Sequence, residues 1–278
     1  MKFGLIYGNT EAPTPEAAAR LARLAELARF ESIWTTEHVV VPAGYESAYP
    51  YSKSGKMARG VEDFDSPDPL VWLSYVAAVT STIRLATGVL ILPLRNPVVL
   101  AKQLATLDVL SGGRVILGVG AGWLAEEFAA LGVPFDNRGR RTDEYIAALR
   151  ALWTQEVASF SGEFTSFENV YSRPLPVQRP IPIVIGGHSP RAARRAGELG
   201  DGFFPASASW EDLPGLVIAV REHAERSGRD PAEIEVTMGT RPEREWVERL
   251  TAAGVDRIVV ASGYGADVIG EFAAEFIH

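Results

Sequence analysis

Residues 181–205 read IPIVIGGHSPRAARRAGELGDGFFP, and this stretch contains one complete structural unit. The apolar run at 181–186 predicts a strand, and the run at 202–205 predicts the strand that follows it. Between them, Ser189 can cap a helix whose first residue is Pro190, where the missing N–H of proline costs nothing. The stretch therefore predicts a strand, a helix and a second strand, which is the repeating unit of α/β proteins.

The same unit recurs along the chain. Three other predicted helix starts place a capping residue before a proline, at Thr14-Pro15, Ser66-Pro67 and Asn96-Pro97. Continuously apolar runs, typical of strands covered on both faces, predict strands at 2–7, 32–36, 84–91, 114–119, 181–186, 202–205, 233–238 and 256–261. Strands alternating with helices in this number predict a (β/α)₈ TIM barrel that forms one domain over residues 1–278. A doubly wound sheet is the alternative.

Two segments interrupt the regular alternation. Residues 39–66 form a long loop after the second strand, rich in Tyr, Phe and Met. Because a loop of this length in a compact domain is usually functional or disordered, we expect an active-site loop, with a disordered excursion as the alternative. Residues 159–180 predict a hairpin-like insertion before the fifth strand.

Charge and composition exclude several classes of function. The net charge is −8, which disfavours nucleic acid and anionic membranes as partners. Cysteine is absent, so disulfides, thiolate metal sites and thiol catalysis are excluded. The N-terminus has no signal-peptide profile, and no apolar run is long enough to span a membrane. We therefore expect a soluble cytoplasmic protein that acts on a small molecule.

The reactive groups of an α/β barrel lie at the C-terminal ends of its strands. The second strand ends in Glu37-His38. Histidine can act as an acid or a base near neutral pH, and the neighbouring carboxylate could orient or charge it; a solvated loop histidine is the alternative. We expect no metal site, because the four histidines show no two-ligand spacing.

Three strand ends are rich in glycine. The run VILGVGAGW at 115–123 is not a dinucleotide-binding fingerprint, because the third position after Gly120 is Trp123 and not glycine. Glycines at this strand end, including Gly122, remove side chains and leave N–H groups for a ligand; a plain turn is the alternative. In the third strand, Gly88-Val89 either allows close backbone approach to a ring or forms a simple bulge.

The fifth strand predicts an anion site. Gly186 and Gly187 leave the strand, and Ser189 and Pro190 open a helix, so unpaired N–H groups and the positive helix end converge. Ordinary helix capping is the alternative. Together with the glycines at 118–122, this strand end predicts a ligand that carries a phosphate.

The chemistry of several barrel enzymes has no matching residues. A Schiff-base aldolase needs a lysine on a barrel strand, but the four lysines lie at the start of the first strand, in the long loop or in a helix. Metal-dependent hydrolases usually need His-x-His ligands, and a glycosidase needs two facing carboxylates at strand ends. These absences favour a bound cofactor as the source of the chemistry.

These motifs, in this order, resemble the luciferase-like oxidoreductases, which are barrels that use flavin or the deazaflavin coenzyme F420. The resemblance covers most of residues 1–205 and rests on TTEH at 35–38, ATGVLILPLRNP at 86–97, LDVLSGGRVILGVGAGWLAEEFAALGVPF at 107–135, GRRTDEYIAALRALW at 139–153 and residues 181–205. The GAGW and GRRTDEY motifs are most similar to the branch that uses F420. After residue 205 the resemblance thins, and no substrate contact is carried over from that part.

The resemblance implies a role for each glycine-rich strand end. Gly88-Val89 is expected to be a cis peptide behind the cofactor ring, and His38 is expected to face the reactive edge of that ring. The cofactor tail and phosphate are expected to contact Gly120, Gly122 and Trp123 on one side and Gly186, Gly187, His188 and Ser189 on the other.

The resemblance implies hydride transfer between F420 and an alcohol, ketone or enone, with a monooxygenase that uses FMN as the alternative. A barrel that only binds a cofactor is an alternative of another class. Relatives are often dimers, so a homodimer is also an expectation.

Overall fold

The computed structural model describes residues 1–52, 54–57, 61–205 and 209–278. Within these residues, parallel strands follow one another around a closed ring, because the last barrel pairing, β3 with β5, completes the circle. The strands of the ring are β1 (Lys2–Ile6), β2 (Ser32–Thr35), β3 (Arg84–Thr87), β5 (Val115–Gly120), β8 (Ile183–Gly186), β9 (Gly202–Phe204), β10 (Glu235–Thr240) and β11 (Arg257–Ala261). The prediction of a (β/α)₈ barrel is therefore confirmed, and the doubly wound sheet is wrong.

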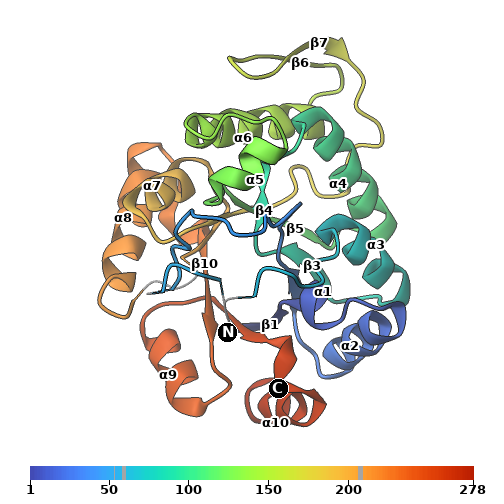
Figure 1. Ribbon diagram of the computed structural model, residues 1–278, viewed down its shortest axis with the longest axis vertical. Helices are drawn as coiled ribbons and strands as arrows, with labels where there is room; N and C mark the ends of the chain where they lie inside the picture. Colours follow the sequence, from blue (N-terminus) through green and yellow to red (C-terminus); the bar gives the residue numbers. More distant parts are fainter. Residues whose placement is uncertain (53, 58–60, 206–208) are drawn as a thin grey trace.

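Helices surround the ring on its outer side (Figure 1). They are α1 (Gly8–Glu11), α2 (Pro15–Leu27), α3 (Pro69–Val79), α4 (Pro97–Ser111), α5 (Ala125–Ala130), α6 (Arg138–Thr154), α7 (Pro190–Leu199), α8 (Leu213–Arg226), α9 (Arg244–Ala252) and α10 (Ala266–Phe276). None of the helices in the described residues has the length and apolar content needed to cross a membrane.

Helix starts follow the predicted capping pattern with one exception. Thr14, Asn96 and Ser189 accept hydrogen bonds from backbone N–H groups in the first turn of α2, α4 and α7. The predicted start at Ser66-Pro67 is wrong, because α3 begins two residues later. There Asp68 caps the helix by accepting from the N–H groups of the second and third helical residues. The aspartate-proline pair is the same local signal as the serine-proline pair, and sequence alone did not separate them.

The observed strands differ from the predicted ones by one or two residues at their ends, and the seventh and third strands differ for identifiable reasons. The seventh strand, predicted at 233–238, begins at Glu235, because a 3₁₀ turn at Pro231–Glu233, capped by Asp230, occupies its first residue. The third strand, predicted at 84–91, is interrupted at Gly88-Val89 and continues as β4 (Leu90–Ile91), which pairs with β5. This interruption shapes the floor of the site described below.

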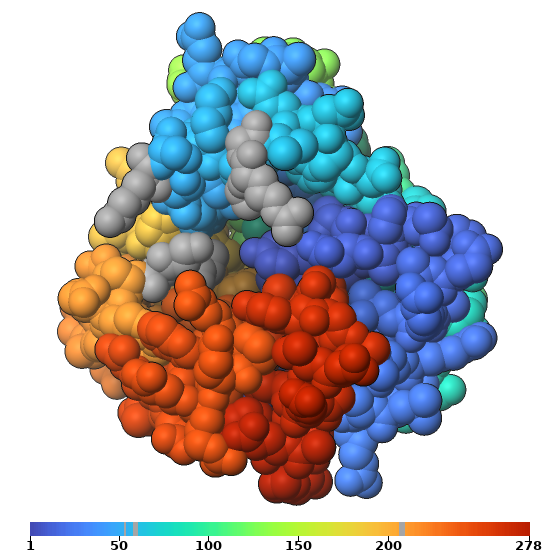
Figure 2. Space-filling model, turned by 60° about the horizontal axis from the view of Figure 1, so that its bottom comes forward, coloured from blue at the N-terminus to red at the C-terminus, as the bar shows by residue number. Residues whose placement is uncertain are grey.

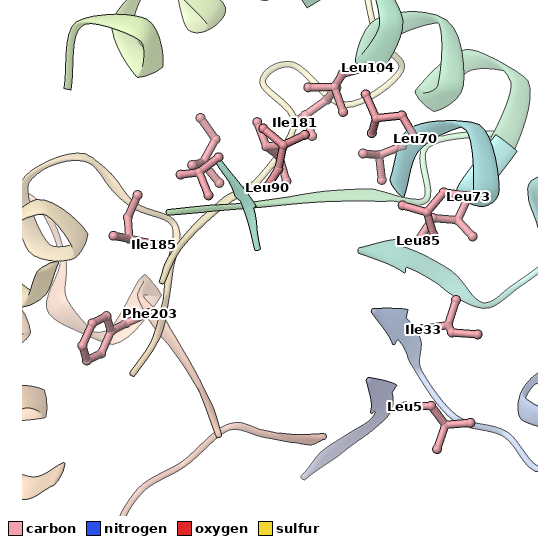
Figure 3. Close-up of a cluster of buried hydrophobic side chains, with 14 of the residues drawn as sticks. Leu5, Ile33, Leu70, Leu73, Leu85, Leu90, Leu104, Ile181, Ile185 and Phe203 are labelled. Carbon is pink, nitrogen blue, oxygen red and sulfur yellow. The ribbon is translucent and has the colours of Figure 1, made fainter. Parts of the chain in front are cut away.

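The apolar core has two layers. The larger layer lies between the ring and the helices, where residues such as Leu5, Ile33 and Leu85 point outward from their strands (Figure 3). The second layer fills the interior of the ring and includes Trp34 and Phe204, whose rings meet edge to face at 5.7 Å. Side chains on both faces explain why the strands are continuously apolar.

The predicted hairpin-like insertion is confirmed. Strands β6 (Ala158–Ser161) and β7 (Ser166–Val170) pair in antiparallel fashion and project beyond α6 (Figure 1). The carboxylate of Glu144 in α6 accepts from the N–H groups of residues 163–165 in the turn between the strands. The hairpin is thereby attached to α6.

Candidate active site

A cavity of about 2100 Å³ opens at the C-terminal ends of the barrel strands. In the space-filling view a hollow lies between the light-blue loop that follows β2 and the orange and red C-terminal third of the chain (Figure 2). Every predicted site residue lines this one cavity: Glu37, His38, Gly88, Val89, Gly120, Gly122, Trp123, Gly186, Gly187, His188 and Ser189. The barrel therefore brings together residues that are far apart in sequence, and their chemical roles stay predictions.

His38 is held by a carboxylate that the sequence did not single out. Its Nδ1 lies 2.9 Å from Oε2 of Glu127, in α5. The Glu127 side chain is fully buried, and its Oε1 accepts from the N–H groups of Val39 at 2.6 Å and Val40 at 3.3 Å. On another side the ring meets Trp123 edge to face, with ring centres 5.8 Å apart. The imidazole is therefore fixed on two sides and is 14% exposed.

The expected pairing of Glu37 with His38 is wrong. The Glu37 carboxylate turns away, accepts from the N–H of Ile91 at 2.5 Å and forms an ion pair with Arg95, whose Nε donates at 2.9 Å. Arg95 also pairs with Asp68, the cap of α3. Burial raises the pKa of Glu37 even though Arg95 acts in the opposite direction. The two adjacent side chains therefore have different partners, Arg95 for Glu37 and Glu127 for His38.

The Gly88-Val89 peptide bond is cis, as the resemblance implied. Gly88 packs on the indole of Trp34, where a Cβ would approach to 2.9 Å. Val89 points between two glycines of neighbouring strands: a Cβ at Gly120 would lie 2.8 Å from its Cγ2, and a Cβ at Gly186 would lie 2.6 Å from its Cγ1. These two glycines thus make room for the valine.

The remaining glycines of the fourth strand also make room for protein atoms. A Cβ at Gly118 would overlap the carbonyl oxygen of Thr87, and one at Gly122 would lie 2.6 Å from the ring of Phe128. Gly122 also has φ +83°, a conformation that favours glycine. The expectation that these glycines leave space for a ligand is therefore incomplete. They are also needed because the backbone of Thr87 and the ring of Phe128 in α5 pack directly against them.

The opposite end of the cavity is basic. Ser189 caps α7 by accepting from the N–H of Ala192 at 3.2 Å, and Gly187 has φ +118° just before it. Nδ1 of His188 is buried without a hydrogen-bond partner among the described residues. Five arginines of α6 and α7 line the cavity: Arg138, Arg140, Arg191, Arg194 and Arg195. Such an arrangement can bind an anion.

Not all of these arginines are free to bind a ligand. Arg195 forms an ion pair with Asp143, and Arg194 forms one with Glu198 at 2.6 Å. No local pattern in the sequence predicts this cluster, because the arginines come from two separate helices. The runs Arg140-Arg141 and Arg194-Arg195 were its only local signal.

The loop 39–66 covers one side of the cavity with aromatic side chains. Its residues 53 and 58–60 lie outside the described part of the chain. The rings of Tyr45 and Tyr49 pack on Trp123 at 5.4 and 5.0 Å, and Tyr51 approaches His188 at 5.1 Å. Burial raises the pKa of Tyr49, which keeps its hydroxyl neutral. The described part of the loop is thus packed against the site.

Helix α5 anchors the start of this loop. The Glu126 carboxylate accepts from the N–H groups of Glu46 at 2.7 Å and Ser47 at 3.0 Å, and the hydroxyl of Ser47 accepts from the N–H of Ala125. The Ser47 hydroxyl and these backbone N–H groups lower the pKa of Glu126 to about 2, against the effect of burial. Adjacent glutamates of α5 therefore hold the loop at two places.

The wall formed by the ends of β1, β9, β10 and β11 is mainly apolar. Ile6, Phe204, Met238 and Val259 line the cavity there. This wall meets the basic end at Phe204, whose carbonyl oxygen accepts from the N–H of Gly187 at 3.0 Å. The cavity therefore has a region suited to an anion beside a region suited to an uncharged organic group.

Comparisons with known proteins agree with the fold. A model of the family described as luciferase-like monooxygenase matches residues 1–242. The chain is 35% identical over 238 residues to an F420-dependent glucose-6-phosphate dehydrogenase of Kineococcus radiotolerans, covering 83% of this chain and 64% of the relative. It is 34% identical over 233 residues to an FMNH2-dependent dimethylsulfone monooxygenase of Pseudomonas putida, covering 81% of this chain and 59% of the relative.

The chain spans less than two thirds of the length of several curated relatives that it matches, these two included. Among solved structures, an F420-dependent secondary alcohol dehydrogenase superposes with a TM-score of 0.82 at 19% identity, over 99% of this chain and 98% of that one. At this identity the likeness bears on the fold. These two relatives in sequence depend on F420 and on FMNH2, which matches the predicted cofactors.

Proposed function

Because the chain belongs to the luciferase-like monooxygenase family, we propose that it is an F420-dependent oxidoreductase acting on a small alcohol, ketone or enone. The observation that carries this proposal is the convergence of His38, Gly88-Val89 and Gly186–Ser189 on one cavity. When bound, F420 would supply hydride transfer without insertion of oxygen.

The residues present fit a cofactor with a flat ring and a phosphorylated tail. The unpartnered Nδ1 of His188, the start of α7 and the nearby arginines would hold the phosphate. Val89, held between Gly120 and Gly186, would back the ring. No part of this arrangement requires a metal ion.

His38 would give or take the proton that accompanies the hydride. Its ring edge lies in the cavity, and its position is fixed by Glu127 and Trp123. The apolar wall of Phe204, Met238 and Val259 would bind the organic substrate and exclude water. Each of these tasks belongs to a residue of the chain and not to the cofactor.

Reduced FMN is the second candidate cofactor, since one relative depends on FMNH2. With FMN the same cavity would serve a monooxygenase. A barrel that binds a cofactor without catalysis is the alternative from another class.

Titration of the purified protein with F420 and, separately, with FMN tests the proposal. We expect F420 to bind at micromolar concentration or below, with a change in fluorescence, and FMN to bind much more weakly. Tight binding of FMN without any response to F420 would overturn the choice of cofactor. Binding of F420 without its reduction or oxidation by a broad panel of alcohols and ketones would favour the non-catalytic alternative.

The His38→Ala variant tests the proton-transfer role. We expect turnover to fall by about 100- to 10,000-fold, with little change in cofactor affinity. His223→Ala is the matched control, because His223 lies in the last turn of α8 and does not line the cavity. Full turnover in His38→Ala would remove His38 from the mechanism.

A further inference from the structure

We propose that Glu127 is the positioning residue of the site, and that it sets the tautomer of His38. The inference rests on the proposed function only for its consequence on turnover. The tautomer itself is a property of the protein without a cofactor.

The geometry defines which ring nitrogen carries the hydrogen. Glu127 Oε2 lies 2.9 Å from Nδ1 of His38, and an ionised carboxylate can only accept. Neutral His38 must therefore carry its hydrogen on Nδ1 and donate it to Glu127. Nε2 is then the unprotonated nitrogen, ready to accept a proton.

The position of Nε2 agrees with this role. Among the described residues, none forms a hydrogen bond with Nε2, although His38 lines the cavity. Nδ1 is occupied by Glu127, and Trp123 limits rotation of the ring. Nε2 is thus the nitrogen left to face a substrate.

The second oxygen of Glu127 determines which end of its side chain faces His38. Oε1 accepts from the N–H groups of Val39 and Val40, which directly follow His38. In a Glu127→Gln variant, the amide oxygen is needed by these two donors, so the amide NH₂ would face Nδ1 and donate to it. The substitution would therefore reverse the tautomer and place the hydrogen of His38 on Nε2.

The experiment is ¹⁵N NMR of the histidine ring nitrogens in the protein without a cofactor, at about pH 8, where an ordinary imidazole is neutral. His38→Ala assigns the signals. We expect hydrogen on Nδ1 in the unchanged protein and on Nε2 in Glu127→Gln. With cofactor and substrate, we expect Glu127→Gln to lower kcat by about 10- to 100-fold with little change in the KM for the cofactor.

Glu126→Gln is the matched control. Glu126 precedes Glu127 in α5 and also holds the loop, at Glu46 and Ser47, but does not contact His38. We expect its spectrum to equal that of the unchanged protein. If Glu126→Gln and Glu127→Gln shift the His38 signals equally, the role of Glu127 is only to hold the loop.

The proposal remains testable if Glu127→Gln does not fold, because the spectrum of the unchanged protein suffices. Hydrogen on Nε2 in that spectrum would overturn it. Failure of the F420 titration, in contrast, would leave the tautomer result intact, so the two proposals can fail separately.

Discussion

Replacing Gly120 by alanine tests how the floor of the cavity is built. A Cβ at this position would lie 2.8 Å from Cγ2 of Val89. Carbon atoms in contact are usually about 3.5–4.0 Å apart, so the methyl group must move by about 0.7–1.2 Å. Gly120 does not have a positive φ, so alanine strains only this contact. We expect a loss of about 1–3 kcal/mol in the free energy of unfolding from overpacking.

The same displacement should affect function. Val89 would back the ring of the cofactor, and an error of about 1 Å in such a position can lower turnover by about 100-fold. Urea unfolding measures the loss of stability, and fluorescence titration with F420 measures binding. Gly186→Ala provides a second measurement, because its Cβ would lie 2.6 Å from the other methyl group of Val89.

Removing the opposing methyl groups should rescue both variants. The double variant Gly120→Ala with Val89→Ala should regain much of the lost stability, with a coupling of about 0.5–3 kcal/mol. If the losses simply add, the glycine does not serve to accommodate Val89. The original expectation, that the glycine admits a ligand, would then be the better explanation.

Two further predictions concern charged groups. Arg95→Leu leaves the buried carboxylate of Glu37 without its cation, so we expect the free energy of unfolding, measured in urea, to fall by about 3–5 kcal/mol. The loss should be smaller when Glu37→Gln is added. Equal stability of the single variant and the unchanged protein would contradict this prediction. Glu26 accepts from the N–H groups of residues 81–83, which lower its pKa from 4.5 to about 2 against the effect of burial. Its stabilisation should be complete above pH 4.5 and be lost as the pH falls through 2. Because the carboxylate contacts solvent, we expect it to contribute only about 1 kcal/mol to the free energy of unfolding. This contribution should be absent in Glu26→Gln. An unchanged acid dependence of stability in that variant would show that Glu26 is not its source.

Local signals account for the parts of the fold that were predicted correctly. A capping residue such as Ser189 accepts a hydrogen bond from an N–H group in the first turn of its own helix. A strand that is buried on both faces is recognised by its continuous run of apolar residues. The start of α3 was misplaced by two residues because Ser66-Pro67 and Asp68-Pro69 carry the same signal. Asp68 also pairs with Arg95, a contact between separate segments that the local sequence does not show.

Contacts within the site could not be predicted in the same way. The partner of His38 is 89 residues away in the sequence, while the neighbouring Glu37 pairs with Arg95, 58 residues away. Sequence proximity favoured the wrong carboxylate. Similarly, the sequence suggested that the glycines at 120 and 186 make room for a ligand. In the structure, the side chain of Val89, which lies between β3 and β4, occupies the space beside them. Such pairings depend on the closure of the barrel, which no local pattern contains.

The two anchors of the loop 39–66 define where it could be exchanged in protein engineering. Residues 38–40 share one carboxylate, that of Glu127, and residues 46 and 47 depend on that of Glu126. A loop transplanted from a relative at the end of β2 would replace His38 itself and the residues 39 and 40 whose N–H groups bind Glu127. A transplant that begins after Ser47 would retain both anchors and change only the covering of the cavity. The boundary for altering substrate preference by loop grafting therefore lies inside the loop and not at the end of the strand.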